Sequence, residues 1–129
     1  MNDDNSGRRL ALVVDDDDDI RFLTTIALET TAGWEVVNAS DGTEAVAVAA
    51  QRRPDVVLLD LMMPGMDGLA TTDALRAQPE TADVPIILLT AKAAAGGTVP
   101  WEGAPISGAL TKPFDPMSLA AQVSEILGW

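Results

Sequence analysis

The sequence predicts an α/β protein in which a five-stranded parallel sheet is covered by helices on both faces. Two observations predict this fold. Short apolar runs recur along the chain, and segments with helical periodicity lie between them. Apolar runs of this length are typical of strands buried on both faces of a parallel sheet. Strands and helices that alternate in this way pack as helical layers around one sheet, with right-handed crossovers.

The predicted strands are the apolar runs themselves, most of which are rich in Val, Ile and Leu and bounded by polar or turn residues. The second run is more polar than the others, which is typical of a strand at the edge of a sheet. The last run is weak and is assigned from its place in the alternation. The predicted strands are Leu10–Val14, Glu35–Ala39, Val56–Leu59, Ile86–Leu89 and Gly108–Thr111.

The first two predicted helices have an apolar stripe and a capping box, respectively. In the first helix, apolar and small residues repeat at i, i+3, i+4, i+7 and i+8, and Asp19 is the expected N-cap. In the second, Asp41 and Glu44 have the spacing of a capping box before the Ala- and Val-rich segment 45–50. The stripe of the first helix consists of Ile20, Leu23, Thr24, Ala27 and Leu28.

The remaining helix signals lie in the second half of the chain. Asp67 is expected to cap a helix over 68–78, which Pro79 ends. Asp115 is the expected N-cap of the final helix, ahead of a first-turn proline, and Gly128 its expected C-cap. We therefore expect a full-length helix after every strand except the fourth.

The segment after the fourth strand, 93–105, contains three glycines and two prolines. Glycine and proline both oppose the interior of a helix. We therefore expect a short or irregular fourth helix there. Trp101 in this segment is a candidate for partner contact.

Length and composition limit the classes of function. The 129 residues suit one domain, and we expect a flexible polar tail over 1–9 and a single domain over 10–129. The net charge of −12 argues against a surface that binds nucleic acid. The chain has no His and no Cys, which excludes a Ser-His-Asp triad, a His general base and thiolate metal sites. A hard cation held by oxygen ligands remains open.

Nothing in the sequence indicates a membrane span or a secretory signal. The apolar runs are far shorter than the roughly 18–20 residues that a helix needs to cross a bilayer. The N-terminal residues lead through two arginines to a short apolar run and then five aspartates, unlike a signal peptide. We therefore expect a cytoplasmic protein that is not inserted in a membrane.

Polar side chains follow four of the predicted strands. Asp15 and Asp16 follow the first strand, Asp60 the third, Thr90 the fourth and Lys112 the fifth. In sheets of this kind, ligands bind at the carboxyl ends of the strands, where these residues meet. Clustered carboxylates repel one another, which favours a divalent cation such as Mg²⁺ among them. With a lysine and a hydroxyl, the group can bind phosphoryl oxygens, and Asp60 is the best candidate for a nucleophile that forms an acyl phosphate.

At these residues the sequence resembles the receiver domains of two-component response regulators. The resemblance runs from about Leu10 to the C-terminus, and its motifs occur in the family's order. It implies a flavodoxin-like (βα)5 fold, doubly wound, with strand order 2-1-3-4-5. The matching motifs are Val-Val-Asp-Asp (13–16), Pro-Asp-Val-Val-Leu-Leu-Asp-Leu-Met-Met-Pro-Gly-Met-Asp-Gly (54–68), Pro-Ile-Ile-Leu-Leu-Thr-Ala (85–91) and Thr-Lys-Pro-Phe (111–114).

The resemblance implies a role for each matching position. Asp60 matches the phosphoacceptor. Asp16 matches a direct Mg²⁺ or Mn²⁺ ligand, Asp15 a ligand that acts through water, and Met62 the residue whose backbone carbonyl completes the metal site. The other roles fall on the later strands: Thr90 and Ala91 as the switch and phosphoryl-binding pair, Lys112 as the phosphoryl-binding lysine, and Lys112-Pro113 as a peptide bond that is often cis.

The resemblance also implies partners. The phosphoryl donor in the family is a phosphohistidine on a sensor histidine kinase or phosphotransfer protein, and this chain has no histidine of its own. Because the chain ends soon after the last predicted helix, we expect a stand-alone receiver that docks on a partner protein. We do not expect an enzyme that turns over an external substrate.

The sequence departs from the family three residues before Lys112. The family usually has Tyr or Phe there, which swings inward when the switch hydroxyl moves, and this chain has Ala109. The route by which a signal leaves the site is therefore expected to differ. Met62 and Lys92 occupy the two positions that tune hydrolysis of the acyl phosphate in the family. Met62 cannot orient a water, which favours slow dephosphorylation.

Two other functions stay open on the residues alone. A phosphatase of the haloacid dehalogenase type would use Asp15 as nucleophile and Asp17 as acid. Asp19 stands where Thr or Val normally follows that motif, and no cap domain fits. The second of these functions is that of an interaction module that does not depend on phosphorylation. The complete set of strand-end residues speaks against it.

Overall fold

A parallel sheet of five strands, in the order β2-β1-β3-β4-β5, forms the centre of the protein. The structure is a computed structural model, and it describes residues 8–91 and 101–129. The strand order confirms the doubly wound topology that the sequence predicts. Two strands are one residue longer than predicted, because Asp60 and Thr90 still pair within the sheet. The strands are β1 (Leu10–Val14), β2 (Glu35–Ala39), β3 (Val56–Asp60), β4 (Ile86–Thr90) and β5 (Gly108–Thr111).

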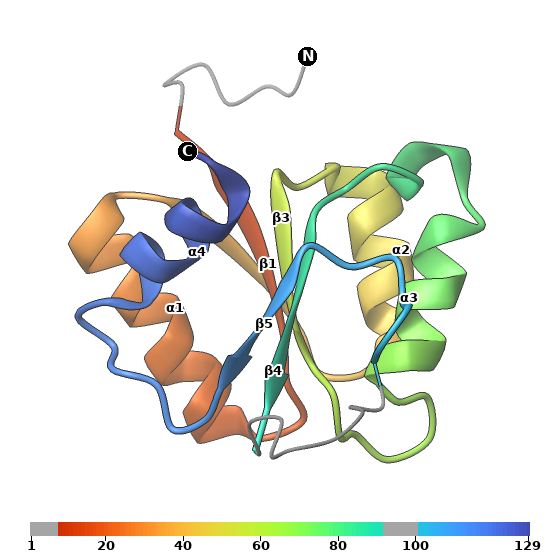
Figure 1. The fold of residues 1–129 in the computed structure, drawn as a ribbon, viewed down its shortest axis with the longest axis horizontal. Coiled ribbons are helices and arrows are strands. Elements are labelled where there is room, and N and C mark those ends of the chain that lie inside the picture. The colour runs from red at the N-terminus through yellow and green to blue at the C-terminus, as the bar shows by residue number, and fades with distance from the viewer. Residues whose placement is uncertain (1–7, 92–100) are drawn as a thin grey trace.

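Helices cover both faces of this sheet, as expected. Figure 1 shows α1 and α4 side by side on one face, and α2 and α3 on the other. The short 3-10 helix η1 follows α3. The label α4 belongs to the helix after β5, since the predicted fourth helix over 93–105 lies mostly outside the described residues and Trp101–Gly103 form a turn. The helices are α1 (Asp18–Ala32), α2 (Gly42–Arg52), α3 (Gly68–Arg76), η1 (Pro79–Thr81) and α4 (Leu119–Leu127).

The three central strands explain why their sequences are almost continuously apolar. Every residue of β1, β3 and β4 is buried, because helices cover these strands on both faces. The strand β2 is mostly half-buried and lies at an edge, which confirms the interpretation of its more polar sequence. Alternate side chains of the central strands point to two separate core clusters, one under α2 and α3 and the other under α1 and α4.

Two helix starts differ from the predictions. Asp17, not Asp19, caps α1, because its carboxylate accepts hydrogen bonds from the amides of Asp19 and Ile20. The final helix begins at Leu119 rather than after Asp115. The carboxylate of Asp115 accepts from the amide of Met117, which closes a turn instead of the first turn of the helix.

The apolar stripe and the proline stop were also partly wrong. Leu23 of the predicted stripe is 45% exposed, so the side of α1 that packs on the sheet is narrower than the spacing suggested. The helix α3 ends at Arg76, and Pro79 starts η1 instead of marking the end itself. Proline fits the first turn of a helix because its missing N–H has no partner there.

The other predicted caps are confirmed. Asp41 accepts from the amide of Glu44 at 2.8 Å, and the carboxylate of Glu44 reaches back to Ser40. Asp67 caps α3 by accepting from the amide of Ala70. Gly128 ends α4 in the left-handed conformation with φ of 73°.

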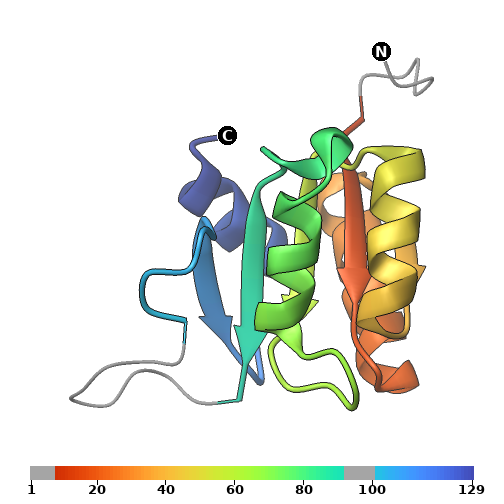
Figure 2. The same ribbon diagram turned by 90° about the vertical axis from the view of Figure 1, so that its right-hand side faces the viewer.

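The two ends of the sheet have different characters. At the carboxyl end, β1, β3, β4 and β5 all point to the same edge, which lies at the bottom of Figure 1 and again in Figure 2. Trp129 lies at the other end. It packs edge to face against Trp34 with ring centroids 5.5 Å apart, and the guanidinium of Arg9 lies 3.7 Å from the centre of its ring. Trp34 and Trp129 thus pack together at this end of the sheet.

Candidate functional site

Three carboxylates meet at the carboxyl edge of the sheet, as the strand ends predict. Asp15, Asp16 and Asp60 each have a carboxylate oxygen within 4.8 Å of the others. The register explains this meeting, because Val14 of β1 pairs with Leu59 of β3, so the next residues of both strands lie side by side. Asp15 and Asp60 are buried, and Asp16 is exposed.

Asp15 is held at all of its polar atoms. Its amide donates to the carbonyl of Ala39 at 3.2 Å, and its own carbonyl accepts from Arg21 at 2.7 Å. Of its carboxylate oxygens, Oδ1 accepts from the amide of Asp17 at 2.9 Å, and Oδ2 accepts from Lys112. This buried carboxylate therefore has a fixed position before any ligand binds.

Lys112 joins the two buried carboxylates. Its Nζ lies 2.9 Å from Oδ2 of Asp15 and 3.4 Å from Oδ1 of Asp60. The backbone amide of Lys112 donates to the carbonyl of Thr90 at 2.7 Å, which ties the end of β5 to the end of β4. The Lys112-Pro113 peptide bond is cis, as the resemblance implies. Lys112, which lies far along the sequence from both acids, thus places its positive charge between Asp15 and Asp60.

The turn after Asp60 depends on a close approach by Gly68, the first residue of α3. A Cβ on Gly68 would lie 2.8 Å from the carbonyl oxygen of Asp60 and 2.8 Å from Cα of Leu61. The amide of Gly68 also donates to the carbonyl of Leu61 at 2.9 Å. At these positions the sequence predicted only a helix cap at Asp67, and nothing in the prediction indicated this packing role of Gly68 beside the site. A glycine directly after a capping residue is the signal that could have revealed it.

Charge repulsion and burial together shift the ionisation of the site. Burial, and next the charge of Asp15, raise the pKa of Asp60 from its ordinary 3.8 to about 6, although Lys112 opposes the change. Burial lowers the pKa of Lys112, but the hydrogen bond and charge of Asp15, together with Asp60, outweigh burial and raise this pKa overall. The site therefore has a carboxylate that is costly to ionise and a lysine that stays charged.

The other predicted positions lie around this centre. Thr90 ends β4 and is buried, whereas the next residue, Ala91, is exposed. The amide of Met62 donates to Oδ1 of Asp60 at 3.3 Å, and its side chain is 72% exposed. Ala109 pairs with Leu88 in the sheet and is half-buried. Lys92 lies outside the described residues.

Trp101 has a packing role in the structure. It is half-buried, and together with Ile106 and Ala109 it packs against the core cluster under α2 and α3. Its predicted contact with a partner stays a prediction.

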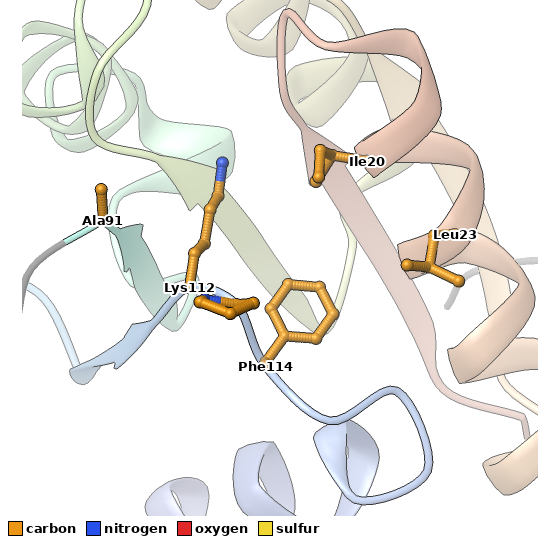
Figure 3. A pocket seen from close by; sticks show the side chains of 6 residues that line it. Ile20, Leu23, Ala91, Lys112 and Phe114 are labelled. Carbon is orange, nitrogen blue, oxygen red and sulfur yellow. The ribbon is translucent and has the colours of Figure 1, made fainter.

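An open pocket lies beside the carboxylates. It has a volume of about 430 Å³ and is lined mainly by apolar side chains. Figure 3 shows Ile20 and Leu23 of α1 on one side of this pocket and Phe114 facing them, with Lys112 reaching upward from β5. The lining residues are Ile20, Leu23, Ala91, Lys112, Pro113 and Phe114.

The donor set fits a hard divalent cation. All three acidic groups offer oxygen, and Mg²⁺ prefers oxygen ligands. Burial of two of these carboxylates next to each other also creates a negative charge that a single lysine does not balance. Asp15, Asp16 and Asp60 would hold the ion. The arrangement resembles sites that bind a phosphoryl group between a metal, a lysine and a hydroxyl.

The fold and this site define a class of protein: signalling modules that work through a cluster of carboxylates at the carboxyl edge of a (βα)5 sheet. The chain belongs to the family of response regulator receiver domains, which it matches over residues 11–124. Receiver domains are signalling modules of two-component systems, and the aspartate cluster is consistent with phosphorylation and magnesium binding.

Known proteins with similar sequences and structures include regulators and a kinase domain. The chain is 39% identical over 90% of its length to the DNA-binding dual master transcriptional regulator RpaA of Synechocystis, of which it covers 48%. It is 34% identical to the chemotaxis protein CheY4 of Vibrio cholerae, with a TM-score of 0.82, over 93% of this chain and 99% of that one.

A third similar structure carries a metal. The receiver domain of the sensor histidine kinase PA1611 of Pseudomonas aeruginosa has a magnesium ion coordinated in its active site cleft. It is 31% identical, with a TM-score of 0.83, over 95% of this chain and 100% of that one. The chain spans half or less of the length of the curated relatives that it matches. Within the described part of the chain, no helix is both long and apolar enough to cross a membrane.

Proposed function

We propose that this receiver domain accepts a phosphoryl group on Asp60 from a phosphohistidine of a partner protein, in a reaction that requires Mg²⁺ or Mn²⁺. One observation carries the proposal: Lys112 contacts both Asp15 and Asp60 at the sheet edge where three carboxylates meet. The site therefore offers a nucleophile, a fixed cation and the ligands of a second cation in one place. The sensor histidine kinase or phosphotransfer protein that donates the group lies outside these 129 residues, which contain no histidine.

The residues divide the reaction between them. A carboxylate oxygen of Asp60 attacks the phosphorus, a P–O bond forms, and the P–N bond to the donor imidazole breaks, with the imidazole leaving. A divalent cation, when bound, supplies positive charge that offsets the carboxylates and the phosphoryl oxygens. Lys112 and the hydroxyl of Thr90 would bind phosphoryl oxygens, and the exposed position of Ala91 leaves room for them. The carbonyl of Met62 would complete the metal site.

The donor has to reach a carboxylate that is almost fully buried, so it must dock beside it. The helix α1 presents Phe22, Leu23 and Ile26 to solvent, and the side chain of Phe22 is 69% exposed. Leu23 continues into the apolar pocket next to Lys112. Exposed apolar patches of this kind mark protein interaction sites. The apolar face of a donor helix would fit this surface and bring its phosphohistidine to Asp60.

The output is a change in docking to a further protein, in the cytoplasm and without direct contact to nucleic acid. The charge of −12 supports the last point, because a nucleic-acid surface needs clustered Lys and Arg. The protein would not be an enzyme acting on an external substrate, since the acyl phosphate forms on the protein itself. The alternative phosphatase loses support because Asp17, its required acid, is the N-cap of α1.

The proposal is tested by phosphorylation with a small donor. The protein is incubated with acetyl phosphate and Mg²⁺, and intact mass is measured against Asp60→Asn and against Asp17→Asn. We expect one added phosphoryl group in the wild type and in Asp17→Asn, none in Asp60→Asn, and none with EDTA. Steady hydrolysis of phosphate esters that depends on Asp15 and Asp17 would instead support the phosphatase, and modification that persists in Asp60→Asn would refute the assignment.

A further inference from the structure

The side chain of Arg21, in the first turns of α1, bridges the turn that connects β1 to α1. Its Nη1 donates to the backbone carbonyl of Asp15 at 2.7 Å, and its Nη2 forms an ion pair with Asp18. The side chain of Arg21 is 19% exposed, whereas that of Asp18 is 85% exposed. One planar group therefore holds both ends of the short segment 15–18, and its contact with Asp15 is the more protected of the two.

This contact controls a peptide plane between two carboxylates of the site. The carbonyl of Asp15 and the amide of Asp16 belong to the same planar peptide unit. Fixing the carbonyl therefore fixes the direction in which the backbone of Asp16 leaves β1. Across residues 8–91 and 101–129, the structure gives Asp16 no hydrogen bond or ion pair of its own, although Asp15 has a partner at every polar atom.

We propose that Arg21 is a positioning residue for the cation site: by holding the Asp15–Asp16 peptide, it presents the exposed carboxylate of Asp16 to the metal. The inference rests on the proposed function, because it assigns Asp16 to the cation. Asp15 and Asp60 have buried, fixed positions, so Asp16 is the ligand whose placement depends most on the backbone. Removal of a group that hydrogen-bonds to a metal ligand and orients it typically lowers metal affinity by about 10–100-fold.

The positive charge of Arg21 and its hydrogen bonds should affect Mg²⁺ affinity in opposite directions. A guanidinium near three carboxylates repels a divalent cation, so removal of the charge alone would strengthen Mg²⁺ binding. Removal of the two-pronged contact would weaken binding. The two roles can therefore be separated, because Lys keeps the charge but has a single compact donor group that cannot bridge Asp15 and Asp18 in the same way.

The test compares Mg²⁺ affinity, measured by isothermal titration calorimetry, in the wild type, Arg21→Lys and Arg21→Gln. Arg52→Gln is the control, since Arg52 forms an ion pair with Glu35 that lies on the surface. We expect Kd to rise about 10-fold in Arg21→Lys and to stay unchanged in Arg52→Gln. Asp18→Asn should have a smaller effect than Arg21→Lys, because solvent screens the exposed pair.

Unchanged affinity in Arg21→Lys, which keeps the charge, would overturn the positioning role. Arg21→Gln should bind Mg²⁺ more tightly than Arg21→Lys, because it also removes the charge that repels the cation. A wild type that binds no Mg²⁺ would instead overturn the proposed function, and the inference with it. A second measurement does not require the metal: ¹⁵N relaxation at the Asp16 amide in the metal-free protein. We expect greater motion at this amide in Arg21→Lys than in the wild type, and equal motion in both would also refute the proposal.

Discussion

Nζ of Lys112 lies 2.9 Å from a carboxylate oxygen of Asp15, although the two residues are 97 positions apart in the sequence. The lysine is partly exposed, and the carboxylate is almost completely buried. The pair therefore does more than hold two strands together. It places a positive charge beside a buried carboxylate that lies next to a second acid.

Replacement of Lys112 by Gln should destabilise the metal-free protein. Asp15 would keep its burial but lose its ionic partner, and the unfolding free energy should fall by about 2 kcal/mol. A divalent cation can replace part of the lost charge, so Mg²⁺ should stabilise Lys112→Gln more than it stabilises the wild type. Urea unfolding in EDTA and in Mg²⁺ measures both effects. Equal stability of the two proteins in EDTA would show that the pair contributes nothing.

The stability of the metal-free protein should depend on pH through Asp60. Because burial and the charge of Asp15 raise the pKa of Asp60 to about 6, the folded state binds a proton that the unfolded state lacks between about pH 4 and 6. Stability contributed by this group therefore increases as pH falls through 6. At pH 7.5 the ionised group is destabilising, by about 3 kcal/mol.

Asp60→Asn isolates this effect, because Asn is neutral at every pH. In EDTA, the variant should be more stable than the wild type at pH 7.5, and the difference should shrink as pH falls from about 6 to about 4. Thermal unfolding of both proteins across this range gives the comparison. A difference that stays constant from pH 4 to 7.5 would mean that Asp60 has an ordinary pKa in the folded protein.

The exposed apolar surface of α1 should matter to a protein donor and not to a small one. Phe22→Ser and Ile26→Ser remove exposed apolar groups without changing the core, so stability should change little. Transfer from a phosphohistidine partner should slow by about 10-fold, since truncation at the centre of an interface typically costs more than 1 kcal/mol. Phosphorylation by acetyl phosphate should keep its rate. Equal loss with both donors would indicate damage to the site instead of a docking surface.

Gly68→Ala should disturb the site through the backbone of Asp60. The added methyl would meet the carbonyl of Asp60 and Cα of Leu61, which are backbone atoms and cannot rotate away. We expect a loss of about 1–3 kcal/mol in stability and slower phosphorylation. Gly65→Asn is the matched control, because a Cβ there meets nothing within 4 Å and Asn tolerates its φ of 75°. An effect of Gly68→Ala no larger than that of the control would contradict the close approach.

Much of the fold followed from residue patterns. The three central strands are buried on both faces, so their sequences are continuously apolar and easy to locate. The parallel arrangement then placed Asp15, Asp60 and Lys112 at one edge, because all strands of such a sheet end at the same side. The strand order itself came from the family resemblance, since apolar runs alone do not say which strands are neighbours.

The sequence predictions failed at positions where several local structures are chemically possible. Within a run of five aspartates, spacing did not decide that Asp17 rather than Asp19 caps α1. The contact of Arg21 with the carbonyl of Asp15 depends on the direction of a peptide plane, which a sequence pattern does not reveal. The approach of Gly68 to Asp60 likewise results from how α3 packs after the turn, and the glycine had a sufficient explanation as part of a helix cap.

Arg76 should control how firmly the segment before β5 is attached. Its guanidinium donates to the carbonyl of Pro105 from Nε at 3.0 Å and Nη2 at 2.9 Å, and to the carbonyls of Thr81 and Ala82 from Nη1. This group joins the end of α3 to the residues that carry Ile106 into the core beside Ala109. Arg76→Gln should lower stability by about 1–3 kcal/mol, because two partly buried carbonyls and one exposed carbonyl lose a charged donor.

The position of the faster amide exchange distinguishes a local effect of Arg76→Gln from a general loss of stability. Amide hydrogen exchange at residues 101–107 should become faster in Arg76→Gln than in Arg52→Gln, whereas exchange within β1 should rise only with the loss of global stability. The amide of Ser107, which donates to the carbonyl of Ile86 at 2.7 Å, is a direct reporter. If exchange at Ser107 followed global stability alone, Arg76 would be an ordinary stabilising contact and the segment would be held by its apolar packing.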